Sequence, residues 1–282
     1  SAQSHWLAGD ARAARDAFEA LLSAPPDSCG GLTIENDLAV MLQALGQLPR
    51  AEHMARRSLA SWAGVAHTET LSWLVLGSVL TSAGRHAEAL TAFDTALQLG
   101  HAQSSPLFIA EALLRRARLH TQCDRWAQAI EDLNTAEPLL AGSADPMRVS
   151  QYAWLRVRCQ IAQGLSLNRG FVEQLSAIAQ RSAHPLLHLR LAGIEAEIAL
   201  QDGNSAAAEQ AALRQAQIAG DAGLLEMYVD ALLLQARANP KPQRAVALLQ
   251  EAQTLAETQG FVHLAARARN ALRKALISQR PG

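Results

Sequence analysis

WLVLGSVLTSAGRHAEALTAFDTAL, residues 73–97, places its smallest residues at fixed distances from large ones. Gly77 lies inside an apolar helical run, although glycine is about 1 kcal/mol less favourable than alanine in a helix interior. Gly84 follows seven residues later, and alanines stand on either side of Phe93. Because two helices pack closely only where small side chains meet, this order predicts two helices joined by a turn at Gly84.

The same phrase, a turn followed by A-x-x-A/F-x-x-A, recurs along the whole chain. Its copies begin at Gly9, Gly46, Gly84, Asp124, Gly164, Gly203 and Pro240. Successive starts lie 37, 38, 40, 40, 39 and 37 residues apart. Each copy holds two amphipathic helices, with apolar residues three and four positions apart, and strand patterns are absent. A regular repeat of helix pairs predicts a solenoid, in which each pair stacks on the next.

The second copy shows how the turns are expected to work. One helix is predicted over 32–45, a turn over 46–49, and a partner helix from Pro49 through Leu59, since proline is well tolerated at a helix start. The glycine of this turn, like Gly84 and Gly203, stands where a helix ends and a left-handed backbone is favoured.

Residues 70–101 resemble a tetratricopeptide repeat (TPR). The matching positions are Trp73, Leu76, Gly77 and Leu80 on the first helix and Ala89, Phe93 and Ala96 on the second. The resemblance implies an all-α fold: a right-handed α-solenoid of about seven TPR-like helix pairs, here with a period of about 37–40 residues. Where the two helices of this repeat meet, Gly77 would allow their close approach. Leucine at this position would overpack the contact and lower the stability by about 1–3 kcal/mol.

The ends of the chain differ from the middle. Only eight residues precede Gly9, so the first repeat is expected to be incomplete. Residues 261–279 predict one amphipathic capping helix, with Phe261, Leu264, Ala268, Leu272 and Leu276 inward and Arg267, Arg273 and Lys274 in water. We therefore expect residues 1–282 to form a single superhelical domain that is part of a longer chain.

Composition narrows the classes of function. The net charge of −1 gives no basic field for nucleic acid, and no apolar run is long enough to cross a membrane. Cys29, Cys123 and Cys159 are widely spaced, which favours free thiols and a cytoplasmic location. Phosphate-loop, dinucleotide, zinc-protease and nucleophile-elbow motifs are absent, so the sequence predicts no enzyme and no cofactor.

One histidine pair is a candidate metal site. His184 and His188 stand four apart in HPLLH, a spacing that can hold zinc on one helical face. A third ligand is missing nearby, so we expect solvated or capping histidines and no metal.

A concave groove is the expected binding surface. By the resemblance, the first helix of each repeat lines it, and the inward offsets select Asn36, Gln43, Ser78, Arg118, Thr121, Trp154 and Arg158. Two guanidinium groups beside an aromatic ring would suit a carboxylate or an acidic, extended peptide. The lysine–asparagine carboxylate clamp of the family is not reproduced. The alternatives are a solvated helix face for Arg115, Arg116 and Arg118, paired with Glu111, and a core position for Trp154.

The function implied is non-catalytic protein or peptide binding. The period and the alanine-rich helices are similar to the helical-repeat sensor regions of bacterial MalT-like and SARP-type transcriptional regulators. By that resemblance the segment would receive a partner or a small-molecule inducer and govern self-association, while DNA is bound elsewhere in the parent chain. A stand-alone TPR adaptor that scaffolds a complex is the alternative.

Overall fold

The computed structural model describes residues 5, 10–23, 34–141, 143, 145–165, 167, 169–182 and 184–278. In these residues it contains fourteen helices and no strand, so the all-α prediction is confirmed. The helices are α2 (Ala11–Leu22), α3 (Ile34–Ala44), α4 (Leu48–Ser61), α5 (Ala66–Ser82), α6 (His86–Ala102), α7 (Pro106–Gln122), α8 (Trp126–Leu140), α9 (Pro146–Ala162), α10 (Arg169–Gln180), α11 (Pro185–Gln201), α12 (Ser205–Asp221), α13 (Leu225–Ala238), α14 (Pro242–Gln259) and α15 (Val262–Ser278).

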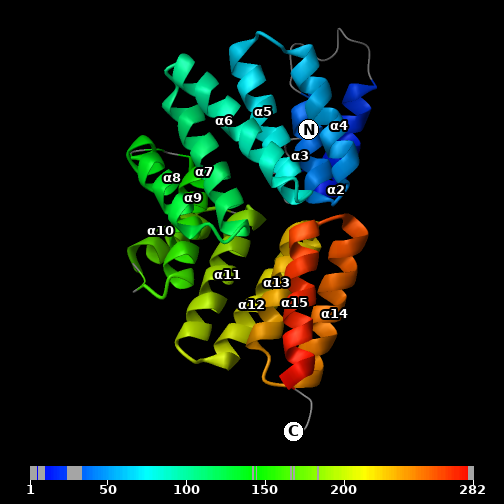
Figure 1. Cartoon of the computed structure of the whole chain (residues 1–282), viewed down its shortest axis with the longest axis vertical. Helices are drawn as coiled ribbons and strands as arrows, with labels where there is room; N and C mark the ends of the chain where they lie inside the picture. Colours follow the sequence, from blue (N-terminus) through cyan, green and yellow to red (C-terminus); the bar gives the residue numbers. More distant parts are fainter. Residues whose placement is uncertain are drawn as a thin grey trace.

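The helices form consecutive antiparallel pairs, from α3–α4 to α13–α14, with α2 before them and α15 after them (Figure 1). The predicted helix of the second copy is found as α3, and Pro49 lies in the first turn of α4, as expected. Three first helices begin with proline after a residue that caps them, at Ser105, Asp145 and His184. The side chain of such a cap accepts a hydrogen bond from a backbone amide that would otherwise be unpaired. Proline has no backbone N–H and therefore leaves no unpaired donor in the first turn, so both residues favour a helix start here.

The turns inside the pairs share one backbone conformation. Gly46, Gly84, Gly164 and Gly203 have φ between 65° and 76°, and Asp124 takes the same left-handed region at φ 55°. The left-handed glycines predicted at three of these turns are thus confirmed. The turn before Pro240 differs: Asn239 ends α13 in an extended conformation.

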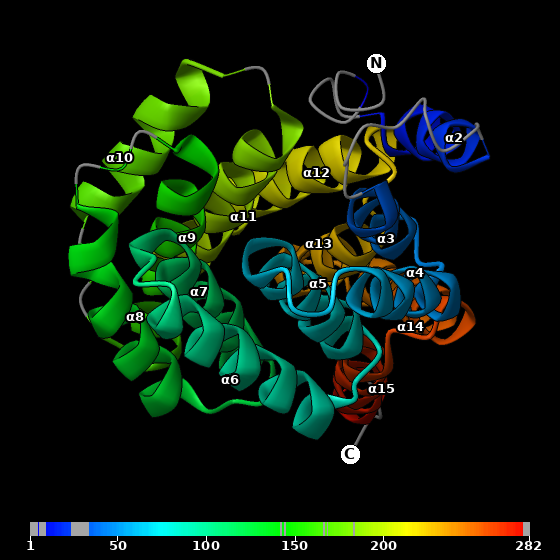
Figure 2. The same cartoon turned by 90° about the horizontal axis from the view of Figure 1, so that it is seen from above.

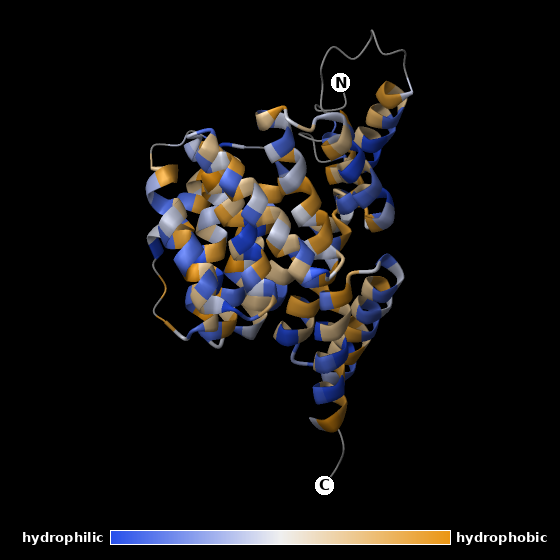
Figure 3. Cartoon of the chain, turned by 45° about the horizontal axis from the view of Figure 1, so that its top comes forward, coloured by the Kyte–Doolittle hydropathy of each residue, from blue (hydrophilic) through white to orange (hydrophobic). Residues whose placement is uncertain are grey.

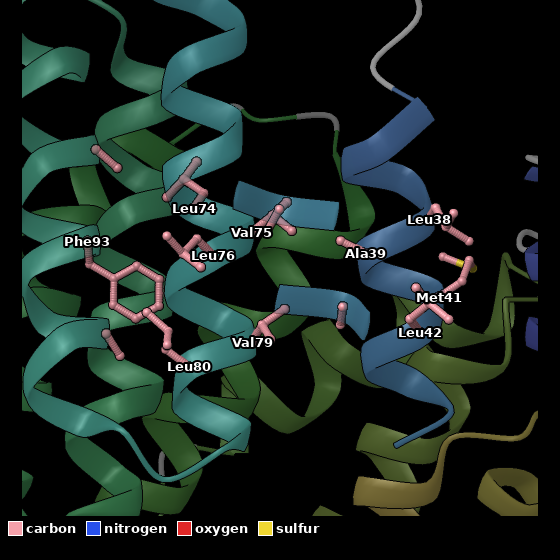
Figure 4. Packing of buried hydrophobic residues seen from close by; sticks show 14 of the residues in the cluster. Leu38, Ala39, Met41, Leu42, Leu74, Val75, Leu76, Val79, Leu80 and Phe93 are labelled. Carbon is pink, nitrogen blue, oxygen red and sulfur yellow. The ribbon is translucent and has the colours of Figure 1, made fainter. Parts of the chain in front are cut away.

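The joint between α5 and α6 explains the glycine that opens the repeat. A Cβ atom on Gly77 would lie 2.5 Å from Cε1 of Phe93, which is 1% exposed. Figure 4 shows the Phe93 ring beside Leu76 and Leu80 of α5. The small residue therefore makes room for an aromatic ring, where the sequence had suggested close approach of two backbones.

The pairs wind into a superhelix. Seen from above, the chain runs clockwise from α6 through α8, α10 and α12 to α14 (Figure 2). It descends over the same course in Figure 1, so the turn is right-handed, as predicted. Helices α5, α7, α9, α11 and α13 lie on the inside, and their partners lie outside (Figure 2).

The first and last pairs of the superhelix meet. Leu48 of α4 is buried in a cluster otherwise made of α13, α14 and α15 residues together with Phe261. A Cβ atom on Gly46 would lie 2.6 Å from Gln259 Oε1, and one on Gly84 would lie 2.8 Å from Cβ of Val262. Stacking of neighbours alone would leave these segments apart, so the chain closes on itself after about one turn.

The last helix departs from its expected pattern in two places. Phe261, Leu264 and Ala268 are buried, but Leu276 is 45% exposed, because nothing among the described residues packs beyond the end of α15. Arg267 does not simply face water: its Nη1 atom lies 2.7 Å from Asp230 Oδ1 on α13.

Every helix carries both hydrophilic and hydrophobic residues (Figure 3). Among the described residues, none of the helices combines the length and apolar character needed to cross a membrane.

Candidate functional site

The inner helices enclose a cavity of about 700 Å³. Its wall is formed by side chains of α3, α5, α7, α9, α11, α13 and α15, with single contributions from Phe93, Trp126 and Gln215 of outer helices. First helices line the cavity because they face the superhelical axis. We call this cavity the central channel.

Six of the seven residues predicted for the groove line the channel: Gln43, Ser78, Arg118, Thr121, Trp154 and Arg158. Asn36 does not, which corrects the prediction for that residue. It is 4% exposed, and its Nδ2 donates to Ser72 Oγ at 2.9 Å, so it joins α3 to α5. Gln43 also bonds within the protein, donating to the Ser78 carbonyl at 3.1 Å and to Ser82 Oγ at 2.9 Å.

The arginines of LLRRARLH are not a solvated face, since each of them binds a carboxylate and is partly buried. Arg115 Nε lies 2.7 Å from Glu111 Oε1, the pair expected from the sequence. Arg116 binds Asp132 of α8 and Asp94 of α6, each at 2.6 Å.

Arg118 is tied to a residue more than a hundred positions away. Its Nη2 lies 2.7 Å from Glu226 Oε1 of α13, and Ser82 Oγ donates to Oε2 of the same carboxylate at 2.7 Å. Burial raises the pKa of Glu226, but the charge of Arg118 and the hydrogen bonds from Ser82 and Arg118 outweigh it, so the net shift is downward. Arg118, one of the two arginines predicted for the groove, therefore already has a counter-ion within the protein.

A second carboxylate joins α7 to α9. Glu111 binds Arg115 through one oxygen and Arg148 Nε through the other at 3.0 Å. Arg115 Nη1 also donates to Ser78 Oγ at 2.6 Å. Burial alone would raise the pKa of Glu111, but the two guanidinium charges lower it below its ordinary value.

Arg158 and Trp154 form the aromatic–cationic pair expected from the sequence. The Arg158 guanidinium carbon lies 4.9 Å from the centre of the Trp154 ring, a geometry suited to a cation–π contact. Burial raises the pKa of the nearby Asp230, but the charges of Arg267 and then of Arg158 outweigh it and hold this pKa far below its usual range.

Arg190 of α11 is the most buried arginine of the channel, with 8% of the residue exposed. Its Nη1 donates to the Met147 carbonyl at 3.0 Å and to Ser150 Oγ at 2.6 Å. Within the described residues it forms no ion pair. Burial, followed by the charge of Arg118, lowers its pKa to about 9, and Glu111 raises it in part.

The channel wall is close to electrically balanced. Seven arginines and six carboxylates line it. Ion pairs with described carboxylates account for five of these arginines, Arg115, Arg118, Arg148, Arg237 and Arg267. Only Arg158 and Arg190 remain without one in this part of the chain.

The histidines of HPLLH have structural partners. His184 Nδ1 accepts the Leu186 amide at 3.2 Å as the cap of α11, and the His188 ring bonds the Ser182 carbonyl at 2.7 Å. Among the described residues, no cluster of three His, Cys, Asp or Glu side chains could hold a metal.

Burial raises the pKa of the Cys159 thiol to about 11, so it is protonated at neutral pH.

Sequence reasoning missed Arg190, Glu226, Asp230 and His263 of the channel. The inward offsets were applied only to the second, third, fourth and fifth repeats, so they did not reach α11, α13 and α15. A signal was present: single charged residues interrupt apolar helices in HLRLAGI and LEMYVDALLL. Because a lone charge in a buried helix needs a partner, such positions tend to mark a polar interior.

Two solved structures resemble this one over nearly its whole length. A Rap protein, solved in complex with competence and sporulation factor, has a TM-score of 0.68 and 14% identity, and covers 99% of this chain and 74% of its own. A signal transduction ATPase with numerous domains (STAND) from Pyrococcus horikoshii, which carries a tetratricopeptide repeat sensor, has a TM-score of 0.54 and 12% identity. It covers 96% of this chain and 43% of its own.

These similarities show that the fold is that of a TPR-like helical-repeat protein. No family model matches the sequence, and no curated protein matches it.

Proposed function

We propose that this chain is a non-catalytic sensor module that binds a short, extended protein segment or peptide in the central channel. The channel itself carries the proposal. Its volume of about 700 Å³ lies within the range of ligand sites, and its wall mixes apolar side chains with charged groups that can orient a bound chain.

Enclosure favours a short ligand over a large folded partner. Gln43, Ser78 and Thr121 line the channel but are each less than a tenth exposed. Because the first and last pairs meet, the inner surface lies within a closed turn of the superhelix. An adaptor that scaffolds folded proteins would need an open concave face, so we favour a sensor over an adaptor.

The parent protein is proposed to be a larger regulator in the cytoplasm. The similarity to a STAND protein with a repeat sensor supports this assignment, as does the absence of a disulfide between Cys123 and Cys159. A small-molecule inducer would fit the same cavity, and we place DNA binding outside this segment.

The test is a peptide-library selection with two matched tryptophan variants. Gln151 of α9 is half-buried and lines the channel, whereas Gln128 of α8 is exposed on the outer layer. We expect selected peptides to bind the unmodified protein and to lose affinity in Gln151→Trp, because the larger indole occupies part of the channel. Gln128→Trp should bind as before.

Fluorescence gives an independent readout, since Trp126 and Trp154 both line the channel. Peptides that bind should shift the tryptophan emission. A selection that yields no binder, or binders that Gln151→Trp leaves unaffected, would show that the channel is not the binding surface.

A further inference from the structure

Among the described residues, two arginines of the channel have no ion pair, and of these only Arg190 also lacks a cation–π contact. Arg190 is 8% exposed and lies on the wall of the cavity. Five other arginines of the wall have carboxylate partners, and Arg158 rests on the Trp154 ring. Burying a charge without a counter-ion is costly, so a site that keeps one is a candidate for binding an anion.

The guanidinium group is held in place with donors to spare. Only its Nη1 atom has acceptors among the described residues, the Met147 carbonyl and Ser150 Oγ. Arginine carries five N–H donors, so those on Nε and Nη2 remain for a ligand. The bonds to α9 fix the planar group before a ligand arrives, which reduces the entropy lost on binding.

The surroundings of Arg190 are apolar on one side. Leu186 and Leu189 come from the same helix, one turn and one residue earlier, and pack with Met147 and Met227. All four also line the channel. A ligand group that reaches Arg190 would therefore lie against aliphatic and thioether side chains.

We propose that Arg190 is the anchor for a carboxylate of the ligand, joined to a short apolar group that packs on Leu186, Leu189, Met147 and Met227. A planar guanidinium with free adjacent donors matches a carboxylate, which it binds through two parallel hydrogen bonds. The carboxylate comes from the end of a peptide, from an acidic side chain, or from a small organic acid. This proposal rests on the proposed function, because it assigns one contact within the same channel.

The charge state suits this role. The lowered pKa of Arg190, about 9, still leaves the group protonated at neutral pH. Burial is the largest cause of that shift, so an anion that supplies a counter-charge is favoured at this position. The effect is local, since the neighbouring arginines already have partners.

The test compares matched acid and amide probes by calorimetry. N-acetyl-leucine against its amide tests a terminal carboxylate, and N-acetyl-Leu-Glu-amide against N-acetyl-Leu-Gln-amide tests a side-chain carboxylate. We expect at least one acid to bind about tenfold or more tightly than its amide. The probe pair in which the acid binds more tightly than its amide identifies the source of the carboxylate. If only the small acid N-acetyl-leucine binds, the ligand is a metabolite.

Two methionine variants locate the effect. Arg190→Met should abolish the preference for the acid, and Arg214→Met should keep it, because Arg214 is not part of the channel wall and pairs with Glu195 at 2.7 Å. Arg190→Met should also melt at or above the temperature of the unmodified protein, since it removes a buried charge. If Arg190→Met does not fold, Arg190→Lys takes its place in the test. The preference for the acid over the amide should then fall by about threefold or more, because lysine lacks the planar pair of donors.

Three outcomes overturn the proposal: acid and amide bind equally, the preference survives in Arg190→Met, or no acid binds below about 10 mM. Each is distinct from failure of the proposed function. Library peptides that bind in the channel and are blocked by Gln151→Trp would leave that function standing even if Arg190 contributed nothing.

Discussion

The ring of His263 lies in the channel wall with only 8% of the residue exposed. Burial lowers its pKa to about 4; Glu226 and Asp230 act against this shift, and the charges of Arg267 and Arg118 add to it. Its Nδ1 atom has no hydrogen-bond partner among the described residues. At the scale of one residue, the fold therefore keeps this imidazole neutral at a position close to several charged groups.

This residue predicts a pH dependence of stability. An unfolded histidine titrates near pH 6.5, so between pH 6.5 and 4 the unfolded chain binds more protons at this site than the folded one. Stability should therefore fall as the pH falls, by about 2 kcal/mol between pH 7 and 5 from His263 alone. Urea unfolding at several pH values measures it, and His263→Gln should show a shallower loss. An equal slope in that variant would contradict the assignment.

At the scale of the helix pair, the contact of Gly77 with Phe93 sets how α5 and α6 fit together. The aromatic ring occupies the space that a side chain at 77 would need. Neighbouring small and large residues thus work as a matched set, and this is why the repeat places them at fixed positions. Gly220 of α12 offers a contrast, because a Cβ atom there would lie 3.7 Å from Tyr228, an ordinary contact.

Gly77→Ala should lower the free energy of unfolding by about 1–3 kcal/mol, since the new methyl group forces the Phe93 ring aside. Gly220→Ala should be neutral or stabilising by up to about 1 kcal/mol, because alanine restricts the unfolded chain without a clash. Chemical denaturation of both variants compares them. In a Phe93→Leu background the cost of Gly77→Ala should shrink, and an unchanged cost would show that the ring is not its cause.

At the scale of the whole molecule, Glu226 connects parts of the superhelix that are far apart in sequence. It accepts from Ser82 of α5 and from Arg118 and Gln122 of α7, while it stands on α13. Glu226 thus links the third and fourth repeats to the seventh, and Leu48 in the cluster of the last helices adds the second repeat. These contacts give the turn its closure and the channel its far wall.

Glu226→Ala should open this closure and leave the charge of Arg118 uncompensated. We expect the free energy of unfolding to fall by about 2–4 kcal/mol and the radius of gyration in X-ray scattering to increase. The control is Glu195→Ala, which breaks an exposed pair with Arg214 and should cost less than about 0.5 kcal/mol. A loss no larger than that of the control would mean that closure does not depend on Glu226.

The periodic small residues predicted the helix pairs and their left-handed turns, because these depend on contacts within one repeat. The resemblance to tetratricopeptide repeats predicted the right-handed stacking, which depends on contacts between neighbouring repeats. Six of the seven expected groove residues line the channel for the same reason. The partners of those residues could not be predicted. Arg118 meets Glu226 only because the superhelix closes and brings α13 beside α5 and α7. Local pattern fixes which way a side chain points, whereas the curvature summed over all repeats fixes what it meets.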